Sequence, residues 1–167
     1  MQAVNPAEEI VIIVDEQNQP IGAVTRKIMR QQRLIHRATY ILVFNSAGEL
    51  FIQKRSRHKD IYPGYWDLAA GGVVLDGEEY EQSARRELRE ELGISGVKLR
   101  PLFDQYYEDG DNRVWGRIYA CTSNGPFTLQ EEEIDEGRFI ALTEIATLNQ
   151  SEPVTPDGLL LLERLPK

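Results

Sequence analysis

The segment GVVLDGEEYEQSARRELREELGI, residues 72–94, joins a glycine-containing start to an acidic, amphipathic stretch. An apolar side chain recurs at every fourth position, which predicts a helix over about 79–92 with one face toward a core. The apolar residues of this stripe are Tyr80, Ala84, Leu88 and Leu92. Gly93 stands where such a helix would stop, because glycine readily adopts the left-handed backbone of a helix end. The segment therefore predicts a loop, a helix and a defined terminus.

Three glutamates of this predicted helix, Glu87, Glu90 and Glu91, are spaced i, i+3 and i+4. Their side chains leave one helix face with neighbouring Cβ atoms roughly 5–6 Å apart, so their charges repel. Arg86, four residues before Glu90, can compensate part of this charge, and Mg²⁺ or Mn²⁺ would compensate more, because hard cations take carboxylate oxygens. A charged face exposed to solvent is the alternative interpretation.

The spacing of the whole segment decides between these two interpretations. It follows the pattern G-x5-E-x7-R-E-U-x-E-E-x-G-U, where U is a bulky aliphatic residue, at all nine specified positions. Chance agreement has a probability under about 10⁻⁸ per starting position if residue usage is near average. The chain therefore resembles the Nudix hydrolase superfamily, and residues 72–94 correspond to its Nudix box.

That resemblance implies an α/β fold of the Nudix type, an α/β/α sandwich with a mixed β-sheet. It also implies Mg²⁺-dependent (or Mn²⁺-dependent) hydrolysis of a diphosphate linkage in a nucleoside diphosphate derivative, in which a glutamate base assists water attack at phosphorus. The implied metal ligands are the Gly71 carbonyl and the carboxylates of Glu87, Glu90 and Glu91. Glu87 is alternatively the base, and Arg86 would orient the glutamates. The structural positions of the box are Gly72, Glu78 and Gly93.

A second acidic cluster, LQEEEIDEGRFIAL, follows the box at residues 129–142. It resembles the acidic segment that many Nudix proteins carry there, which can supply another metal ligand or the catalytic base. Glu133 and Glu136 are the candidates for this role. An acidic turn exposed to solvent is the alternative.

Residues 34–72, LIHRATYILVFNSAGELFIQKRSRHKDIYPGYWDLAAGG, resemble the isopentenyl-diphosphate isomerase branch of the superfamily, and this similarity extends over roughly residues 10–75. In that branch an arginine and a lysine at the positions of Arg55 and Lys59 hold the substrate diphosphate. An arginine can do so through a bidentate fork and a lysine as a point charge. The alternative is an ordinary basic turn.

The isomerase branch also requires a Cys-Gly-His run at the entrance to the box, where this chain has Gly71-Gly72-Val73. His36 matches another metal-ligand position of the isomerase, but without the second histidine a structural role is favoured. Cys121 lies elsewhere, in a predicted strand. Hydrolase chemistry on an isomerase-like frame is therefore the leading hypothesis, and the chain resembles a bacterial Nudix branch with this N-terminal extension. An isomerase and a non-catalytic nucleotide-binding module are the alternatives.

The rest of the chain predicts one domain, residues 1–167, with an N-terminal hairpin and helix as an extension over residues 1–37. Further predicted elements are a hairpin of about 38–44 and 50–55, two strands around the turn Glu108–Asn112, a strand in GRFIAL, and helices in LTEIATLN and TPDGLLLLERL, the last capped by Thr155. Alternation in RVWGRIYAC places Arg117 on an aromatic and basic strand face, which predicts either a substrate contact or a half-buried sheet surface.

The net charge of −8 argues against a broad nucleic-acid surface but is compatible with a small phosphorylated substrate that binds with a metal. One cysteine excludes an internal disulfide framework. No apolar run reaches the roughly 18 residues of a membrane span. We therefore expect a cytoplasmic protein without a membrane partner, and a homodimer by analogy with the superfamily.

Overall fold

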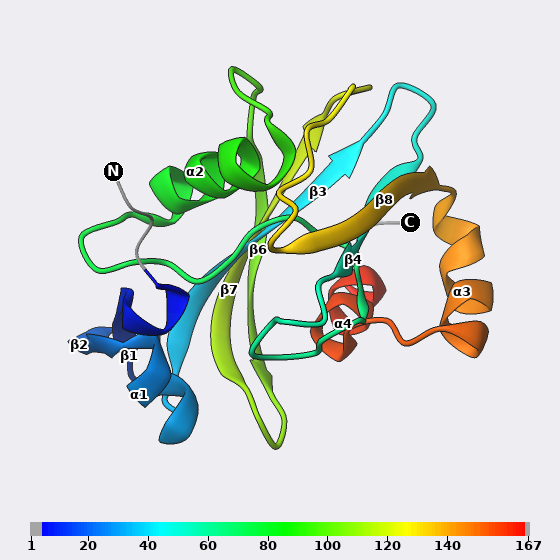
Figure 1. The fold of residues 1–167 in the computed structure, drawn as a ribbon. Coiled ribbons are helices and arrows are strands. Elements are labelled where there is room, and N and C mark those ends of the chain that lie inside the picture. The colour runs from blue at the N-terminus through cyan, green and yellow to red at the C-terminus, as the bar shows by residue number, and fades with distance from the viewer. Residues whose placement is uncertain (1–4, 166–167) are drawn as a thin grey trace.

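The computed structural model describes residues 5–165 of the chain. Its strands are β1 (Ile10–Val14), β2 (Pro20–Thr25), β3 (His36–Phe44), β4 (Leu50–Arg55), β5 (Trp66–Asp67), β6 (Arg100–Glu108), β7 (Arg113–Thr122) and β8 (Ile134–Ile140). Its α-helices are α1 (Arg26–Gln31), α2 (Tyr80–Leu92), α3 (Ile145–Ser151) and α4 (Pro156–Glu163) (Figure 1). Short 3₁₀ turns are η1 (Pro6–Glu8) and η2 (Leu142–Glu144). Within the described residues, no helix has the length and apolar character to cross a membrane.

The strands form one mixed, eight-stranded sheet in which β3 is central. β7 runs parallel to β3 along its whole length, from the pair His36 and Val114 to the pair Phe44 and Thr122. The other strand pairs are antiparallel: β1 with β2 and β3, β4 with β3, β5 and β8, and β6 with β7. The mixed sheet predicted for this chain is thus confirmed.

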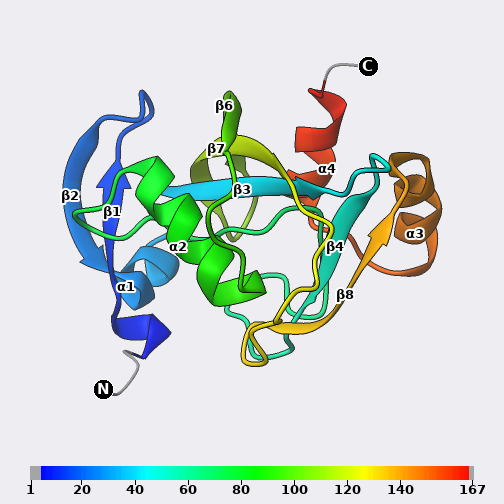
Figure 2. The ribbon, with the colours of Figure 1, turned by 90° about the horizontal axis from the view of Figure 1, so that it is seen from above.

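Helices cover both faces of this sheet, with α2 on one side and α4 on the other, as Figure 2 shows on either side of β3. Successive residues of β3 point to opposite faces, so Ile41 belongs to the core beneath α2 and Leu42 to the core beneath α3 and α4. The predicted apolar stripe of α2 is buried throughout, at 4% exposure or less. The two cores make the α/β/α sandwich.

The predicted hairpin of about 38–44 and 50–55 is only partly correct, because β3 and β4 pair at a single position, Phe44 with Leu50. Residues 70–74 occupy the edge of β3 that a regular hairpin would have paired. Ile41 N–H donates to the Ala70 carbonyl at 2.7 Å, and Thr39 N–H donates to the Gly72 carbonyl at 2.9 Å. The two strands therefore diverge, and the space between them is available to a site.

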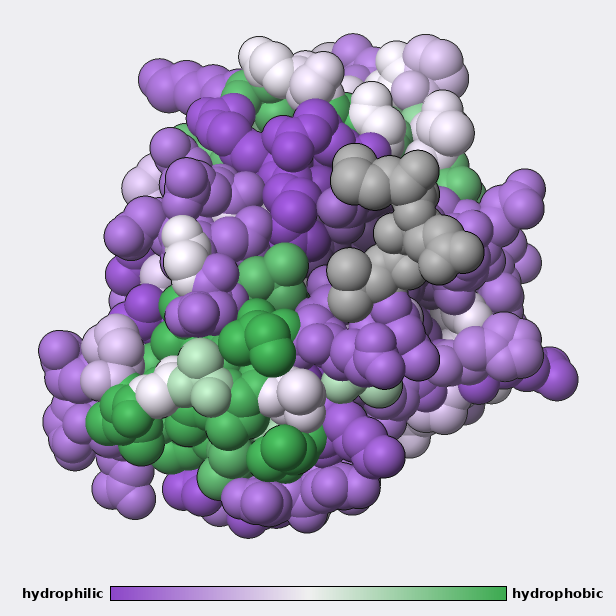
Figure 3. Space-filling model, turned by 60° about the vertical axis from the view of Figure 1, so that its left-hand side comes forward, coloured by the Kyte–Doolittle hydropathy of each residue, from purple (hydrophilic) through white to green (hydrophobic). Residues whose placement is uncertain are grey.

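The N-terminal extension adds the hairpin β1–β2 to the edge of the same sheet. Val11 and Ile13 of β1 pack with Met29 of α1 in a small separate core, which fixes α1 against the sheet. Ile10 and Ile21 stay exposed, and an apolar patch is visible on this side of the molecule (Figure 3).

One predicted helix cap is wrong. The side chain of Thr155 makes no capping hydrogen bond at the start of α4, although Pro156 is the first helical residue as predicted.

Candidate functional site

A cavity of about 610 Å³ lies where β3 and β4 diverge, between α2, the segment 69–73 and the N-terminal extension. Nine of the residues singled out from the sequence line it: Arg55, Lys59, Gly71, Gly72, Arg86, Glu87, Glu90, Glu91 and Glu133. The box helix and the isomerase-like segment thus contribute to one cavity.

Helix α2 holds the box glutamates in place through its ends and its buried stripe. At its N-terminus, Glu79 and Gln82 form a reciprocal capping box, in which the Glu79 N–H donates to Gln82 Oε1 at 2.8 Å. At its C-terminus, Gly93 has φ of 70°, and its N–H donates to the Arg89 carbonyl. The predicted helix stop at Gly93 is thus confirmed in the backbone geometry.

Glu87 and Glu91 meet at the wall of the cavity. Glu91 is 7% exposed, and its Oε2 accepts a hydrogen bond of 3.0 Å from Gln53 Nε2. The two carboxyl groups are within hydrogen-bonding reach of each other. Burial raises the pKa of both, and the charge of Glu87 raises that of Glu91 further. This pair requires a cation or a shared proton between its oxygens.

Arg86 connects the remaining acidic residues of the box. Its guanidinium binds Glu78 through two N–H groups, at 2.7 Å and 3.0 Å, and its Nη1 reaches Glu87 at 2.8 Å and Glu90 at 3.1 Å. Burial lowers the pKa of Arg86, but the bond to Glu78 and the surrounding carboxylates together raise it. Glu78 also accepts the Leu75 N–H, so Arg86 and Glu78 fasten the glycine-containing loop to the helix.

Two glycines let the loop come close to β3 and α2. Gly71 has φ of 135°, and a Cβ on it would collide with the Thr39 carbonyl oxygen. A Cβ on Gly72 would lie 2.8 Å from Glu87 Oε1. The Ala70 and Gly72 carbonyls accept hydrogen bonds from β3, whereas within residues 5–165 the Gly71 carbonyl between them accepts no backbone hydrogen bond.

These donors fit a divalent cation such as Mg²⁺ or Mn²⁺. One buried carboxylate, one partly buried carboxylate and a carbonyl oxygen are hard ligands, and a cation would relieve the repulsion between Glu87 and Glu91. Glu90 is directed at Arg86 instead, and within residues 5–165 no three acidic, histidine or cysteine side chains are arranged to hold a metal together. Glu87, Glu91 and Gly71 thus lie together at the cavity wall, whereas Glu90 is paired with Arg86.

Both basic residues carried over from the isomerase-like segment line the cavity, each with an acidic partner. Arg55 Nη1 donates to Asp67 at 2.8 Å, and Lys59 forms an ion pair with Glu133. Lys59, a predicted phosphate contact, and Glu133, a predicted metal ligand or base, therefore contact each other.

Two of the candidate residues are not brought to the cavity. Arg117 pairs with Asp104 at 2.8 Å and lies over the ring of Tyr80, 4.2 Å from its centroid. Glu136 is exposed on β8, opposite Lys54. Neither residue lines the cavity: Arg117 stays against Tyr80 at the start of α2, and Glu136 points to solvent from β8.

The structure adds cavity residues that the sequence did not single out. Arg26 and Arg30 of the extension reach the cavity and bind Asp60, and the Tyr40 hydroxyl donates to Asp157 at 2.7 Å. The i, i+4 spacing of the two arginines in RKIMR was a usable signal, whereas Tyr40 and Asp157 are 117 residues apart and share no local pattern.

His36 is a further wall residue, at 2% exposure. Burial, followed by the charge of Arg30, lowers its pKa to about 3, so the imidazole is neutral near pH 7. Its Nδ1 lies 3.4 Å from the Leu34 carbonyl, which is consistent with the structural role favoured from the sequence.

Comparison with known proteins gives consistent results. The family model described as "NUDIX domain" matches residues 34–160. The "Uncharacterized Nudix hydrolase PA4841" of Pseudomonas aeruginosa is 47% identical over 154 residues, covering 92% of this chain and 91% of that protein. The "Uncharacterized Nudix hydrolase YfcD" of Escherichia coli K12 is 45% identical, covering 92% and 84%. The crystal structure of DR0079 from Deinococcus radiodurans is 27% identical, with a TM-score of 0.83, covering 95% and 100%.

Proposed function

Because the chain belongs to the Nudix hydrolase family and is an enzyme that hydrolyses pyrophosphate bonds, we propose that it acts on a nucleoside diphosphate derivative with Mg²⁺ or Mn²⁺. The observation that carries this proposal is the pair of neighbouring carboxylates at the wall of a cavity, the buried Glu91 and the partly buried Glu87. A general use of divalent metals is typical of the family and agrees with this donor set.

The proposed ligand residues are Glu91 and the Gly71 carbonyl, with Glu87 as a further ligand or as the base, and with Glu90 joining them when Arg86 releases it. A bound divalent cation would neutralise charge on the diphosphate oxygens and make a water easier to deprotonate. Arg86 keeps Glu87 in position through its Nη1, while its other N–H groups are held by Glu78. This arrangement limits the movement of Glu87 during the reaction.

Two carboxylates are placed to accept the proton of the attacking water. Glu87 is raised in pKa by burial, which favours proton uptake. Glu133 lines the same cavity but is paired with Lys59. We favour Glu87 as the base, because Glu133 is occupied by Lys59. Comparing the turnover of Glu87→Gln with that of Glu133→Gln shows which of the two carboxylates accepts the proton.

Substrate binding would use the basic wall of the cavity. Arg55 and Lys59 present N–H donors there, and a phosphate group can exchange with their present partners, Asp67 and Glu133. A cavity of about 610 Å³ is within the range of small-molecule sites and larger than a diphosphate alone requires. A small phosphorylated molecule is the ligand class that suits it.

The isomerase alternative would need a thiol at the cavity. The chain has one cysteine, Cys121, which is buried in β7 within the core beneath α2 and is not part of the cavity wall. Burial raises the pKa of this thiol to about 11, so it is protonated near neutral pH. Its position supports hydrolysis over isomerisation.

The test is Glu91→Gln, which keeps the side-chain shape and removes a ligand charge. Turnover of a panel of nucleoside diphosphates, nucleoside diphosphate sugars and dinucleotides is measured with Mg²⁺ or Mn²⁺. We expect kcat/KM to fall by about a hundredfold or more, the effect of losing one group that stabilises transition-state charge. Glu81→Gln is the matched control, because Glu81 is on the exposed side of the same helix. Activity of Glu91→Gln within a few-fold of the parent would contradict the ligand assignment.

A further inference from the structure

Helix α1 of the N-terminal extension presents two arginines to the cavity. Arg26 and Arg30 are one turn apart, so they project from the same helix face. Thr25 caps the helix by accepting the Ile28 N–H, and the Met29 side chain, at 1% exposure, is anchored in the small core with Val11 and Ile13. The helix is therefore held so that both guanidinium groups face the cavity. We call Arg26 and Arg30 the arginine pair.

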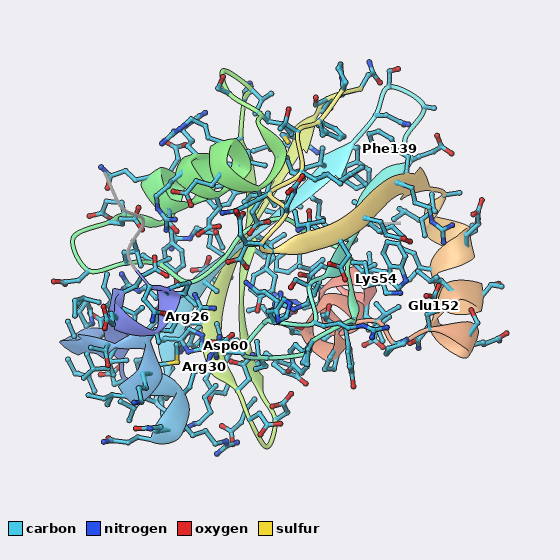
Figure 4. The ribbon with its side chains drawn as sticks, in the orientation of Figure 1. Arg26, Arg30, Lys54, Asp60, Phe139 and Glu152 are labelled. Atoms are coloured by element: carbon cyan, nitrogen blue, oxygen red, sulfur yellow. The ribbon has the colours of Figure 1, made fainter. Side chains whose placement is uncertain are left out.

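The arginine pair shares a single close carboxylate, that of Asp60. Arg26 donates to it through two N–H groups, at 2.9 Å and 3.3 Å, and Arg30 donates through Nε at 3.1 Å. Figure 4 shows the three side chains converging from α1 and from the loop after β4. The arginine side chains are only 14% and 17% exposed, whereas that of Asp60 is 36% exposed.

The number of carboxylates for each basic side chain is lower here than at the other basic residues of the cavity discussed above. Arg55 and Lys59 each have a carboxylate of their own, but the arginine pair has one in direct contact, and Glu9 is 3.9 Å from Arg26. Burial, and then the charges of Arg26 and Arg55, lower the pKa of Arg30 against the opposing effect of Asp60. At this end of the cavity two largely buried arginines thus share one directly bonded carboxylate, with Glu9 at the edge of ion-pair distance from Arg26.

The arginine pair also keeps hydrogen-bonding capacity. A guanidinium carries five N–H groups. Within residues 5–165, Arg30 uses Nε on Asp60 and Nη1 on the Asn112 side chain, and Arg26 uses Nε and Nη2 on Asp60. A phosphoryl group can therefore be added to the pair or can replace the partly exposed Asp60 carboxylate.

We propose that the arginine pair binds a second anionic phosphoryl group of the substrate, beyond the diphosphate bridge that is cleaved. The inference rests on the proposed function, and it assigns substrate choice to residues that precede the family match at 34–160. Substrates with a free phosphoryl group are preferred over those in which a neutral group closes the diphosphate. The free group is either the end of the phosphate chain or a phosphate on the attached moiety.

The first experiment compares Arg30→Gln with Lys27→Gln, which removes the same charge from the exposed side of the same helix. The substrates are a nucleoside triphosphate, a nucleoside diphosphate sugar and the same sugar nucleotide with a phosphate on its sugar. For Arg30→Gln, KM for at least one phosphate-bearing substrate rises about tenfold or more, as expected for loss of a charged hydrogen bond, and kcat is unchanged. The neutral-sugar substrate is unaffected, and the phosphate-bearing substrate that responds identifies the source of the phosphoryl group.

A second experiment needs no turnover and no metal. Inorganic diphosphate is titrated into the protein in EDTA and binding is measured by calorimetry. Arg30→Gln weakens binding, Lys27→Gln does not, and Asp60→Asn strengthens it by removing a competing carboxylate. Damage to the fold would weaken binding in all cavity variants, so the opposite sign of Asp60→Asn excludes it.

The proposal is overturned by three results: no saturable binding of diphosphate to the parent, equal affinity of the parent and Arg30→Gln, or an equal rise of KM for all three substrates. The calorimetric results stand even if no substrate is hydrolysed. Failure of the proposed function, shown by an active Glu91→Gln, is therefore distinguishable from failure of this inference.

Discussion

Replacing Gly72 with alanine tests the position of Glu87 without changing any charged group. The new Cβ would lie 2.8 Å from Glu87 Oε1 and 2.9 Å from its Cδ, whereas ordinary contact begins at 3.4 Å. The difference requires a movement of about 0.6 Å by the carboxylate or the loop. Glu87 cannot move freely, because it is bonded to Arg86 at 2.8 Å and faces Glu91.

The magnitude follows from this displacement. A misplacement of about 1 Å at a reacting centre can cost about a hundredfold in rate, so we expect kcat of Gly72→Ala to fall by about ten- to a hundredfold. Overpacking costs about 1–3 kcal/mol of unfolding free energy, which lowers Tm by about 3–10 °C for a chain of this size. The protein should still fold and bind its substrate.

Steady-state kinetics at saturating Mg²⁺ and a thermal melt measure the two effects. Gly22→Ala is the control, because a Cβ at Gly22 meets no atom within 4 Å. If Gly72→Ala folds with kcat within threefold of the parent, the close approach of Gly72 to Glu87 has no bearing on the reaction. The positioning argument for Glu87 would then be refuted.

Two stability predictions complete the set. The pKa of buried His36 is lowered to about 3, so between about pH 6.5 and pH 3 the unfolded chain binds a proton that the folded chain does not. The contribution of neutral His36 to the unfolding free energy is therefore complete above about pH 6.5 and falls by up to about 3–5 kcal/mol as the pH is lowered toward 3. In urea titrations at pH 7 and pH 4.5, His36→Asn should therefore lose less stability on acidification than the parent does, whereas exposed His58→Gln should behave as the parent; equal losses in all three proteins would contradict the assignment. Tyr40→Phe should lower the unfolding free energy by about 1–3 kcal/mol, because it leaves the Asp157 carboxylate buried without its hydroxyl donor. Tyr106→Phe removes an exposed hydrogen bond to Glu108 and should lower the unfolding free energy less. Equal losses would show that burial of Asp157 is unimportant.

The sequence by itself determined the elements that depend on local spacing. The apolar stripe at every fourth residue fixed helix α2 and its buried face, and Gly93 fixed its end. The hairpin predicted for the N-terminal extension is likewise present, as β1 and β2. Local patterns suffice here because helix and hairpin geometry are set by residues a few positions apart. The complete box spacing gave the family for the same reason, since one helix and its entry loop carry the motif.

Only the tertiary structure decided how the cavity is built. β3 and β4 diverge because residues 70–74 pair with β3, and no local pattern in either strand predicts this pairing. Lys59 meets Glu133 from 74 positions away, and Arg26 meets Asp60 from 34. Charge and periodicity along the chain specify which side chains face a core. Which of those side chains contact each other is decided only when separate elements pack on one sheet.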